Sequence, residues 1–200
     1  LGCEYGITEE RSSIIRNGVD LTRFGPHREP EDLHKRLQLD SGDSLLLFVG
    51  SLDQKKGLFV LLDALKILVD SGESVHLALV GDGPLREPLK AKIKDLDLEK
   101  NATMLGDIRH EQLPGIFAAC DIYVQPSLIE PFGVVVLEAA ASAKPVVVTN
   151  VPGMREVITD DAATLVPPGE ESALAKAIQN LLGNPELRAE KGANARKLME

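Results

Sequence analysis

Residues 125–144 read QPSLIEPFGVVVLEAAASAK, and this stretch guides the interpretation of the whole sequence. Residues 122–124 before it are apolar and predict a buried strand, while its small-residue end predicts a helix. Pro131 disfavours helical geometry at Glu130, so this glutamate is expected in the turn after the strand. Gly133 falls near the start of the helix, where a missing Cβ lets backbone N–H groups approach an anion closely.

This arrangement offers two carboxylates at different depths. Glu138 lies one to two turns inside the predicted helix, and the positive end of that helix lies between it and Glu130. A ligand with phosphate groups in its middle and hydroxyls at both ends would suit such a site, and a nucleotide-sugar has this form. The alternative is that Glu130 only caps the helix and that Glu138 is a solvated helix residue.

The segment EPFGVVVLE also resembles a known signature. Its two glutamates are separated by seven residues that include PFG, and a predicted strand precedes them while PVVV follows. This pattern is similar to the E-x7-E motif of the family 4 (group 1) retaining glycosyltransferases, which have the GT-B fold.

The composition is that of an ordinary globular protein, with 44% apolar and 26% charged residues in a chain of 200. Lys and Arg number 22 against 31 Asp and Glu, and the net charge of −9 argues against a nucleic-acid surface. No apolar run approaches the roughly 18 residues that cross a bilayer. Cys3 and Cys120 lack metal-ligand spacing, which favours free thiols in a reducing compartment and a cytoplasmic location.

Strand and helix patterns alternate from residue 45 onward and predict an α/β fold, a Rossmann-like parallel sheet with helices on both faces. The expected strands are residues 45–50, 75–81, 102–105, 122–124, 145–150 and 163–166. The expected helices are residues 58–69, 84–97, 111–119, 134–143, 155–158, 170–182 and 185–198, with a surface helix between residues 27 and 40. In such a sheet, ligands bind outside the carboxyl ends of the strands.

Residues 50–57, GSLDQKKG, follow the first strand but lack the Gly-Lys-Ser/Thr pattern of a P-loop. They resemble the family's G-R-L-x-x-x-K-G segment, in which an arginine and a lysine hold the donor diphosphate. Gly50 and Lys56 match this segment, but Ser51 stands in the arginine position. A serine hydroxyl donates one neutral hydrogen bond and forms no charged bidentate pair. The alternative for Lys56 is an exposed lysine at a helix start.

Two loops follow the second and third strands. Residues 81–85, GDGPL, lack the third glycine of a dinucleotide fingerprint, so NAD binding is not expected and a structural turn is favoured. Residues 105–108, LGDI, resemble the loop whose backbone faces the nucleotide base in the family. Asp107 and Ile108 are therefore candidate contacts of the base.

Two further signals are weaker. Residues 150–156, NVPGMRE, resemble the family's G-G-x-x-E turn, in which Gly153 fits a position of close backbone approach. His110 is expected at a helix start rather than in a site. The sequence offers no metal-ligand cluster and no Ser/His/Asp arrangement.

Residues 14–26, IIRNGVDLTRFGP, resemble the stretch that joins the two domains of family 4 enzymes. The resemblance divides the chain into residues 1–43, an interdomain linker and N-terminal segment left from a first domain, and residues 44–200, a nucleotide-sugar-binding Rossmann-like domain. The alternative is an N-terminal arm that closes a hairpin with a turn at Asn17 and Gly18.

Over most of the chain the resemblance implies the C-terminal, donor-binding domain of a two-domain enzyme. Glu138 would bind the ribose hydroxyls, Glu130 the hydroxyls of the transferred sugar, and Lys56 the diphosphate leaving group. The N–H groups near Phe132 and Gly133 would approach sugar and phosphate. The implied reaction is retaining, hexosyl-type transfer with no cofactor and no required metal, assisted by cations and a helix end.

A glycan, lipid or small-molecule acceptor would bind the missing N-terminal domain, so the 200 residues alone are expected to be inactive. Membrane association of the full-length protein stays open. Two alternatives remain. A GT-B-like nucleotide-sugar epimerase would need acid–base residues that the sequence does not reveal, and a non-catalytic nucleotide-binding module would fit the departure at Ser51.

Overall fold

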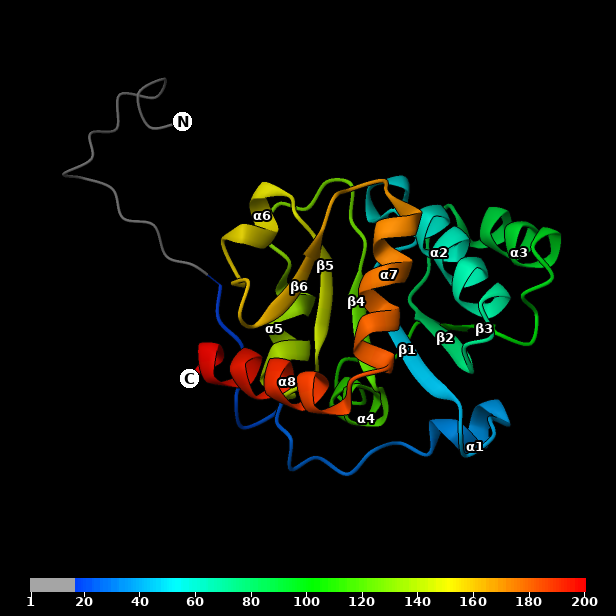
Figure 1. The fold of residues 1–200 in the computed structure, drawn as a ribbon. Coiled ribbons are helices and arrows are strands. Elements are labelled where there is room, and N and C mark those ends of the chain that lie inside the picture. The colour runs from blue at the N-terminus through cyan, green and yellow to red at the C-terminus, as the bar shows by residue number, and fades with distance from the viewer. Residues whose placement is uncertain (1–16) are drawn as a thin grey trace, which may run out of the picture.

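A computed structural model describes residues 17–200 and confirms the predicted Rossmann-like α/β fold (Figure 1). Its sheet has six parallel strands in the order β3-β2-β1-β4-β5-β6. The strands are β1 (Ser44–Val49), β2 (Val75–Val80), β3 (Ala102–Gly106), β4 (Ile122–Gln125), β5 (Val146–Thr149) and β6 (Ala163–Val166).

The strand order reverses between β1 and β4. The chain builds β1, β2 and β3 toward one edge and then returns to place β4 on the other side of β1. Loops that leave the carboxyl ends of β1 and β4 therefore diverge from a common point, which is where open α/β sheets bind their ligands. The predicted residues Lys56 and Glu130 follow these two strands.

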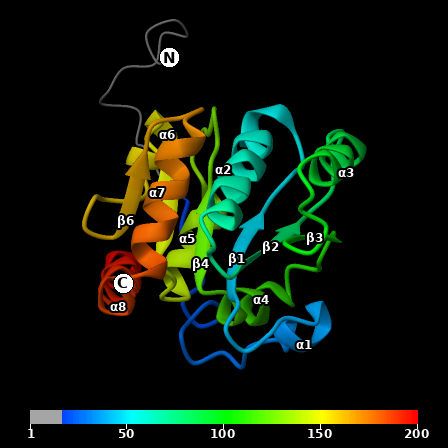
Figure 2. The same cartoon turned by 45° about the vertical axis from the view of Figure 1, so that its right-hand side comes forward.

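Helices cover both faces of the sheet, as the unbroken apolar strands require. One face packs against α2 (Leu58–Asp70), α3 (Arg86–Asp95) and α7 (Glu171–Leu182). The other packs against α1 (Leu33–Leu37), α4 (Leu113–Ala119), α5 (Val134–Ala141), α6 (Pro152–Arg155) and α8 (Pro185–Met199). In Figure 2, α2 and α7 lie in front of the sheet, and α5 lies behind it.

Alternation along each strand divides its side chains between the two cores. In β1, Leu45 and Leu47 join the core under α4 and α5, whereas Leu46 and Phe48 join the core under α2. The same alternation in β4 places Tyr123 on the α5 face and Val124 on the opposite face. This assignment decides which β4 side chains lie beneath the candidate site.

Three local expectations differ from the structure. The surface helix expected between residues 27 and 40 is limited to α1, which Asp32 caps by accepting a hydrogen bond from the Lys35 N–H. The short helix expected at residues 155–158 lies three residues earlier as α6, because Pro152 occupies its first position.

The third difference concerns the N-terminal segment. The chain turns at residues 21–23, where the Asp20 carboxylate accepts hydrogen bonds from the Thr22 and Arg23 N–H groups, and not at residues 17–18. The first three residues of the 14–26 stretch lie outside the described residues, as does Cys3. None of the helices within residues 17–200 has both the length and the apolar character needed to span a membrane.

Candidate functional site

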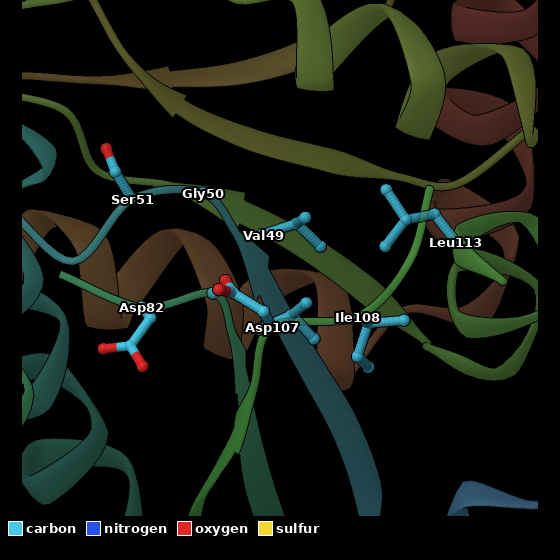
Figure 3. Close-up of a pocket in the computed structure, with 9 residues that line it drawn as sticks. Val49, Gly50, Ser51, Asp82, Asp107, Ile108 and Leu113 are labelled. Carbon is cyan, nitrogen blue, oxygen red and sulfur yellow. The ribbon is translucent and has the colours of Figure 1, made fainter. Parts of the chain in front are cut away.

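The carboxyl ends of β1, β2 and β3 border a cavity of about 300 Å³ (Figure 3). Figure 3 shows Ser51 and Asp82 on one side of this cavity, Leu113 on the other, and Asp107 between them. Its lining consists of Val49, Gly50, Ser51, Val80, Gly81, Asp82, Asp107, Ile108 and Leu113. Four predicted site residues from two separate loops are thus brought together here.

Glycines let the first two loops approach each other closely. A Cβ on Gly81, whose φ is +125°, would lie 1.9 Å from the Gly50 carbonyl oxygen. A Cβ on Gly83 would lie 2.6 Å from the Leu52 carbonyl oxygen, which also accepts a 2.9 Å hydrogen bond from the Leu85 N–H. The GDGP turn therefore locks two loops together, in keeping with the structural role expected for it.

Carboxylates dominate the charge of this cavity. Asp82 pairs with Arg86 at 2.7 Å, and the hydrogen bond from the Gly83 N–H, together with the nearby arginine, lowers the pKa of the Asp82 carboxyl. Asp107 adds a second acidic group to the lining. Such a cavity favours hydroxyl and amide donors over phosphate groups.

Lys56 lies next to Gly50 of the cavity wall but is not itself part of the lining. It ends a short 3-10 helix, Gln54–Lys56, that Asp53 caps by accepting a hydrogen bond from the Lys55 N–H at 2.9 Å. A Cβ built on Gly50 would lie 3.9 Å from Lys56 Cε. The Lys56 ammonium then forms a 2.7 Å ion pair with Glu130 Oε2. The two predicted catalytic residues are therefore in direct contact, although 74 positions separate them.

The loops that carry this pair are joined by their backbones. The Lys55 carbonyl oxygen accepts hydrogen bonds from the N–H groups of Leu128 and Ile129, at 2.7 and 3.2 Å. Gly57, with φ at +65°, packs so closely that a Cβ would lie 2.1 Å from the Pro126 carbonyl oxygen. These backbone contacts therefore fix the position of Lys56 relative to the loop that follows β4.

Glu130 lies in the turn after β4, as predicted, with a side chain only 9% exposed. Besides Lys56, its Oε2 is 3.3 Å from the Ser127 hydroxyl and 3.5 Å from the Gln125 amide nitrogen. Its Oε1 accepts a 3.3 Å hydrogen bond from the Gly133 N–H. Several donors therefore hold the carboxylate in place at a site where an unpaired charge would be costly.

The helix start predicted near Gly133 is present. Gly133 has φ and ψ of +74° and +48° and precedes the first residue of α5, and Phe132 beside it is partly buried against the core. The Gly133 N–H that was expected to face sugar or phosphate is directed at Glu130 in this structure. A ligand that took this N–H would have to compete with the carboxylate.

Glu138 lies within α5 and is 6% exposed, so it is not the solvated helix residue of the alternative interpretation. Its Oε1 is 2.7 Å from Nε2 of His110. His110 lies in the turn before α4 and follows the Asp107–Ile108 loop, which lines the first cavity. The second predicted carboxylate thus belongs to the same edge of the sheet, with a histidine as its partner.

Three residues that touch the glutamates were not predicted as site residues: His110, Gln125 and Ser127. A signal was present for each of them. His110 follows a strand that ends at the predicted site, and Gln125 and Ser127 are polar residues at the end of an otherwise apolar strand. Their partners could not be derived from spacing, because 28 positions separate His110 from Glu138.

Ser51 is exposed and does not point at Lys56. Its hydroxyl donates a 2.8 Å hydrogen bond to Asp53 Oδ2 and so supports the carboxylate that caps the 3-10 helix. The serine therefore has a local structural partner in place of the arginine's expected contact with phosphate.

Glu130 also lines a second cavity, of about 350 Å³. Leu128, Ile129, Glu130, Pro131, Val151, Pro152, Gly153 and Glu156 line it. A Cβ on Gly153 would lie 1.9 Å from the Glu130 carbonyl oxygen, so the close approach predicted for this glycine is present. Of the Lys56–Glu130 pair, Lys56 thus lies next to the first cavity and Glu130 lines the second.

Within residues 17–200, no group of three or more His, Cys, Asp or Glu side chains is arranged to hold a metal ion.

Residues 29–198 match the family model for glycosyl transferases group 1. A similar curated protein is the alpha-D-kanosaminyltransferase of Streptomyces kanamyceticus, which is 32% identical over 168 residues. That match covers 84% of this chain and 43% of the relative. The chain spans about half the length, or less, of the curated relatives it matches first.

Solved structures are similar over most of the chain. The Anabaena protein HepE in complex with UDP-glucose is 28% identical, with a TM-score of 0.86 over 98% of this chain and 55% of HepE. The C-terminal domain of a group 1 family glycosyl transferase from Francisella tularensis is 25% identical, with a TM-score of 0.79. That match covers 90% of this chain and 96% of the other. With the family model, these similarities establish that the chain belongs to the group 1 glycosyl transferases.

Proposed function

We propose that this chain binds the nucleotide-diphosphate sugar donor of a retaining glycosyltransferase at the carboxyl edge of its sheet. Residues 44–200 would form the donor domain, and residues 1–43 would link it to a domain that holds the acceptor. The match to HepE, which has been solved with UDP and with UDP-glucose, supports this class of ligand. The half-length match to curated relatives supports a partner domain.

The observation that carries the proposal is the 2.7 Å pair between Lys56 and Glu130 at the point where the strand order reverses. A cation and a carboxylate side by side provide one group for a diphosphate and one for sugar hydroxyls. Glu138 lies on the helix that follows Glu130 and would accept hydrogen bonds from ribose hydroxyls. The acidic first cavity, with Asp107 and Ile108, would hold the base and ribose rather than phosphate.

In the proposed reaction, the bond between the anomeric carbon and the diphosphate oxygen breaks, the acceptor hydroxyl oxygen forms the new bond to that carbon, and the acceptor's proton passes to the departing diphosphate. Negative charge grows on the departing diphosphate, where the Lys56 ammonium and the N–H groups at the start of α5 would stabilise it. Phe132 and Gly133 lie at that helix start. Transfer with retention of configuration is part of the proposal, as is an acceptor bound outside these 200 residues.

A non-catalytic nucleotide-binding module is the second candidate, because Ser51 donates to Asp53 and leaves the family's arginine position without a cation. Both candidates predict nucleotide binding, and only the first predicts that the sugar adds affinity through Glu130. A preference for the sugar-bearing ligand therefore separates them.

The test is thermal unfolding of the protein with UDP, GDP and ADP and with their glucose derivatives. Ligand at 100 times its Kd adds about 2.7 kcal/mol of stability. For a chain of this length, that raises Tm by roughly 5–10 °C. We expect one nucleotide series to give such a shift and Glu138→Gln to abolish most of it. A flat response to every ligand would contradict the proposal.

A further inference from the structure

A buried chain of polar side chains runs from the middle of β4 to the Glu130 carboxylate. Tyr123 and Gln125 share one face of β4, and both are almost fully buried, as is Ser127 after the strand. Buried polar groups at three positions in five residues are costly unless their hydrogen bonds are satisfied. Here each side chain forms a hydrogen bond with the next.

The hydrogen bonds among these side chains all run in one direction, from Tyr123 toward Glu130. The Gln125 amide nitrogen must face Glu130, since a carboxylate only accepts, and it donates to the Ser127 hydroxyl at 2.9 Å. Ser127 in turn donates to Glu130 Oε2 at 3.3 Å. This orientation leaves Gln125 Oε1 to accept from the Tyr123 hydroxyl, which also lies 3.4 Å from the Val49 carbonyl oxygen.

The Tyr123 hydroxyl, which is the first donor in this series of hydrogen bonds, keeps its proton. Burial, and then the negative charges of Glu138 and Glu130, raise the pKa of the Tyr123 hydroxyl well above its usual value. The tyrosine is therefore a hydroxyl donor at neutral pH, and the direction of these hydrogen bonds does not reverse there.

The two oxygens of Glu130 are used unequally. Oε2 faces Lys56, Ser127 and Gln125, whereas among residues 17–200 Oε1 accepts only the 3.3 Å hydrogen bond from Gly133. A carboxylate oxygen accepts about two hydrogen bonds, so Oε1 has room for one more donor and Oε2 has none. A hydroxyl of a bound sugar would therefore meet Oε1.

We propose that Gln125, acting through Ser127, is a positioning residue that fixes the Glu130 carboxylate so that Oε2 holds Lys56 and Oε1 is presented to one hydroxyl of the donor sugar. The part concerning the sugar rests on the proposed function above. The part concerning the carboxylate stands on the hydrogen bonds alone. Gln125 touches no ligand in this account and acts only through Glu130.

The first experiment needs no ligand. Urea unfolding is measured for Gln125→Met, Glu130→Gln and the double variant, with Ser127→Ala as a smaller deletion of the same link should Gln125→Met fail to fold. We expect non-additivity, so that the loss of urea midpoint caused by Gln125→Met, or by Ser127→Ala, falls by about half in the Glu130→Gln background. Additive losses would overturn the positioning role.

The second experiment asks whether positioning affects sugar recognition. Kd is measured by calorimetry for a nucleoside diphosphate and its glucose derivative, using whichever of the UDP, GDP and ADP pairs stabilises the wild type most. We expect Gln125→Met to change the diphosphate Kd by less than about twofold and to weaken the glucose derivative about tenfold. His76→Leu is the matched control, since His76 is equally buried but lies in β2 and bonds Lys100 and Thr103.

The outcomes separate the two proposals. Equal weakening of both ligands in Gln125→Met, or an equal change in the control, would overturn the sugar-specific role. If the wild type binds none of these ligands, the proposed function fails, while the urea experiment still decides whether Gln125 positions Glu130.

Discussion

Lys56 and Glu130 form an ion pair, and removing one or the other should change the affinity for a plain nucleoside diphosphate in opposite directions. The ammonium and Oε2 are 2.7 Å apart, and the two side chains are 20% and 9% exposed. In the free protein, Glu130 therefore acts as the counter-ion of Lys56. A diphosphate must share this lysine with the carboxylate or displace it.

Lys56→Met removes the cation but keeps the length of the side chain. A charge-assisted hydrogen bond contributes about 1.5–3 kcal/mol, so diphosphate affinity should fall roughly 10- to 150-fold. Stability should also fall, by about 1–3 kcal/mol, because Glu130 remains charged and buried with Ser127 and Gly133 as its donors. This loss is smaller than for a fully buried pair, since Lys56 is partly exposed.

Glu130→Gln leaves the cation without its competitor. An ion pair at a partly open site contributes about 0.5–1 kcal/mol, so plain diphosphate should bind about two- to fivefold more tightly. The advantage of a sugar-bearing ligand over the plain diphosphate should shrink at the same time. Calorimetry at two salt concentrations measures both effects, and the Lys56 contribution should weaken in high salt. A Glu130→Gln variant that loses diphosphate binding as severely as Lys56→Met would refute this reasoning.

Three further predictions concern other parts of the site and the core. Ser51→Arg should tighten diphosphate binding about tenfold or more by adding a forked cation, whereas the uncharged Ser51→Gln should not, and titration of both variants decides the matter. Gly153→Ala should displace the Glu130 loop and reduce both stability and ligand binding, since its Cβ would lie 1.9 Å from a carbonyl oxygen; Gly42→Ala, which meets nothing within 4 Å, should be neutral in both assays. Burial lowers the pKa of His76 from its usual value of 6.5, so the unfolded chain takes up the proton first. Stability should therefore be lost as pH falls below about 6.5, with a slope of at most about 1.4 kcal/mol per pH unit, and His76→Leu should remove that slope in urea unfolding.

The sheet was predictable because its strands are short, continuous apolar runs separated by helical periods. β1 and β2 show this most clearly, and each observed boundary lies within one residue of the predicted one. The helix expected from residue 84 starts later, at Arg86, because Gly83 and Leu85 are held in a turn against Leu52. Periodicity carries no information about such contacts between loops.

The candidate site was predictable only as a list of residues. Parallel strands bring their carboxyl ends to one edge, which explains why Gly50, Ser51, Asp107 and Ile108 meet in one cavity. The sequence could not show that Glu130 pairs with Lys56 or that Glu138 pairs with His110, because such contacts depend on side-chain directions across different loops. In the same way, the sequence could not show that the Ser51 hydroxyl donates to Asp53, the residue that caps the Gln54–Lys56 helix.

The proposed binding mode places a nucleotide-sugar along the carboxyl edge of the sheet, with its ribose at Glu138 and its sugar at Glu130. Its most direct test is calorimetric titration of wild type, Glu138→Gln and Glu130→Gln with the preferred nucleoside diphosphate and with its glucose derivative. We expect Glu138→Gln to weaken both ligands by a similar factor. We expect Glu130→Gln to reduce the advantage of the glucose derivative over the diphosphate, without weakening binding of the plain diphosphate. If both variants lost affinity for the diphosphate and for its glucose derivative by the same factor, this binding mode would be contradicted.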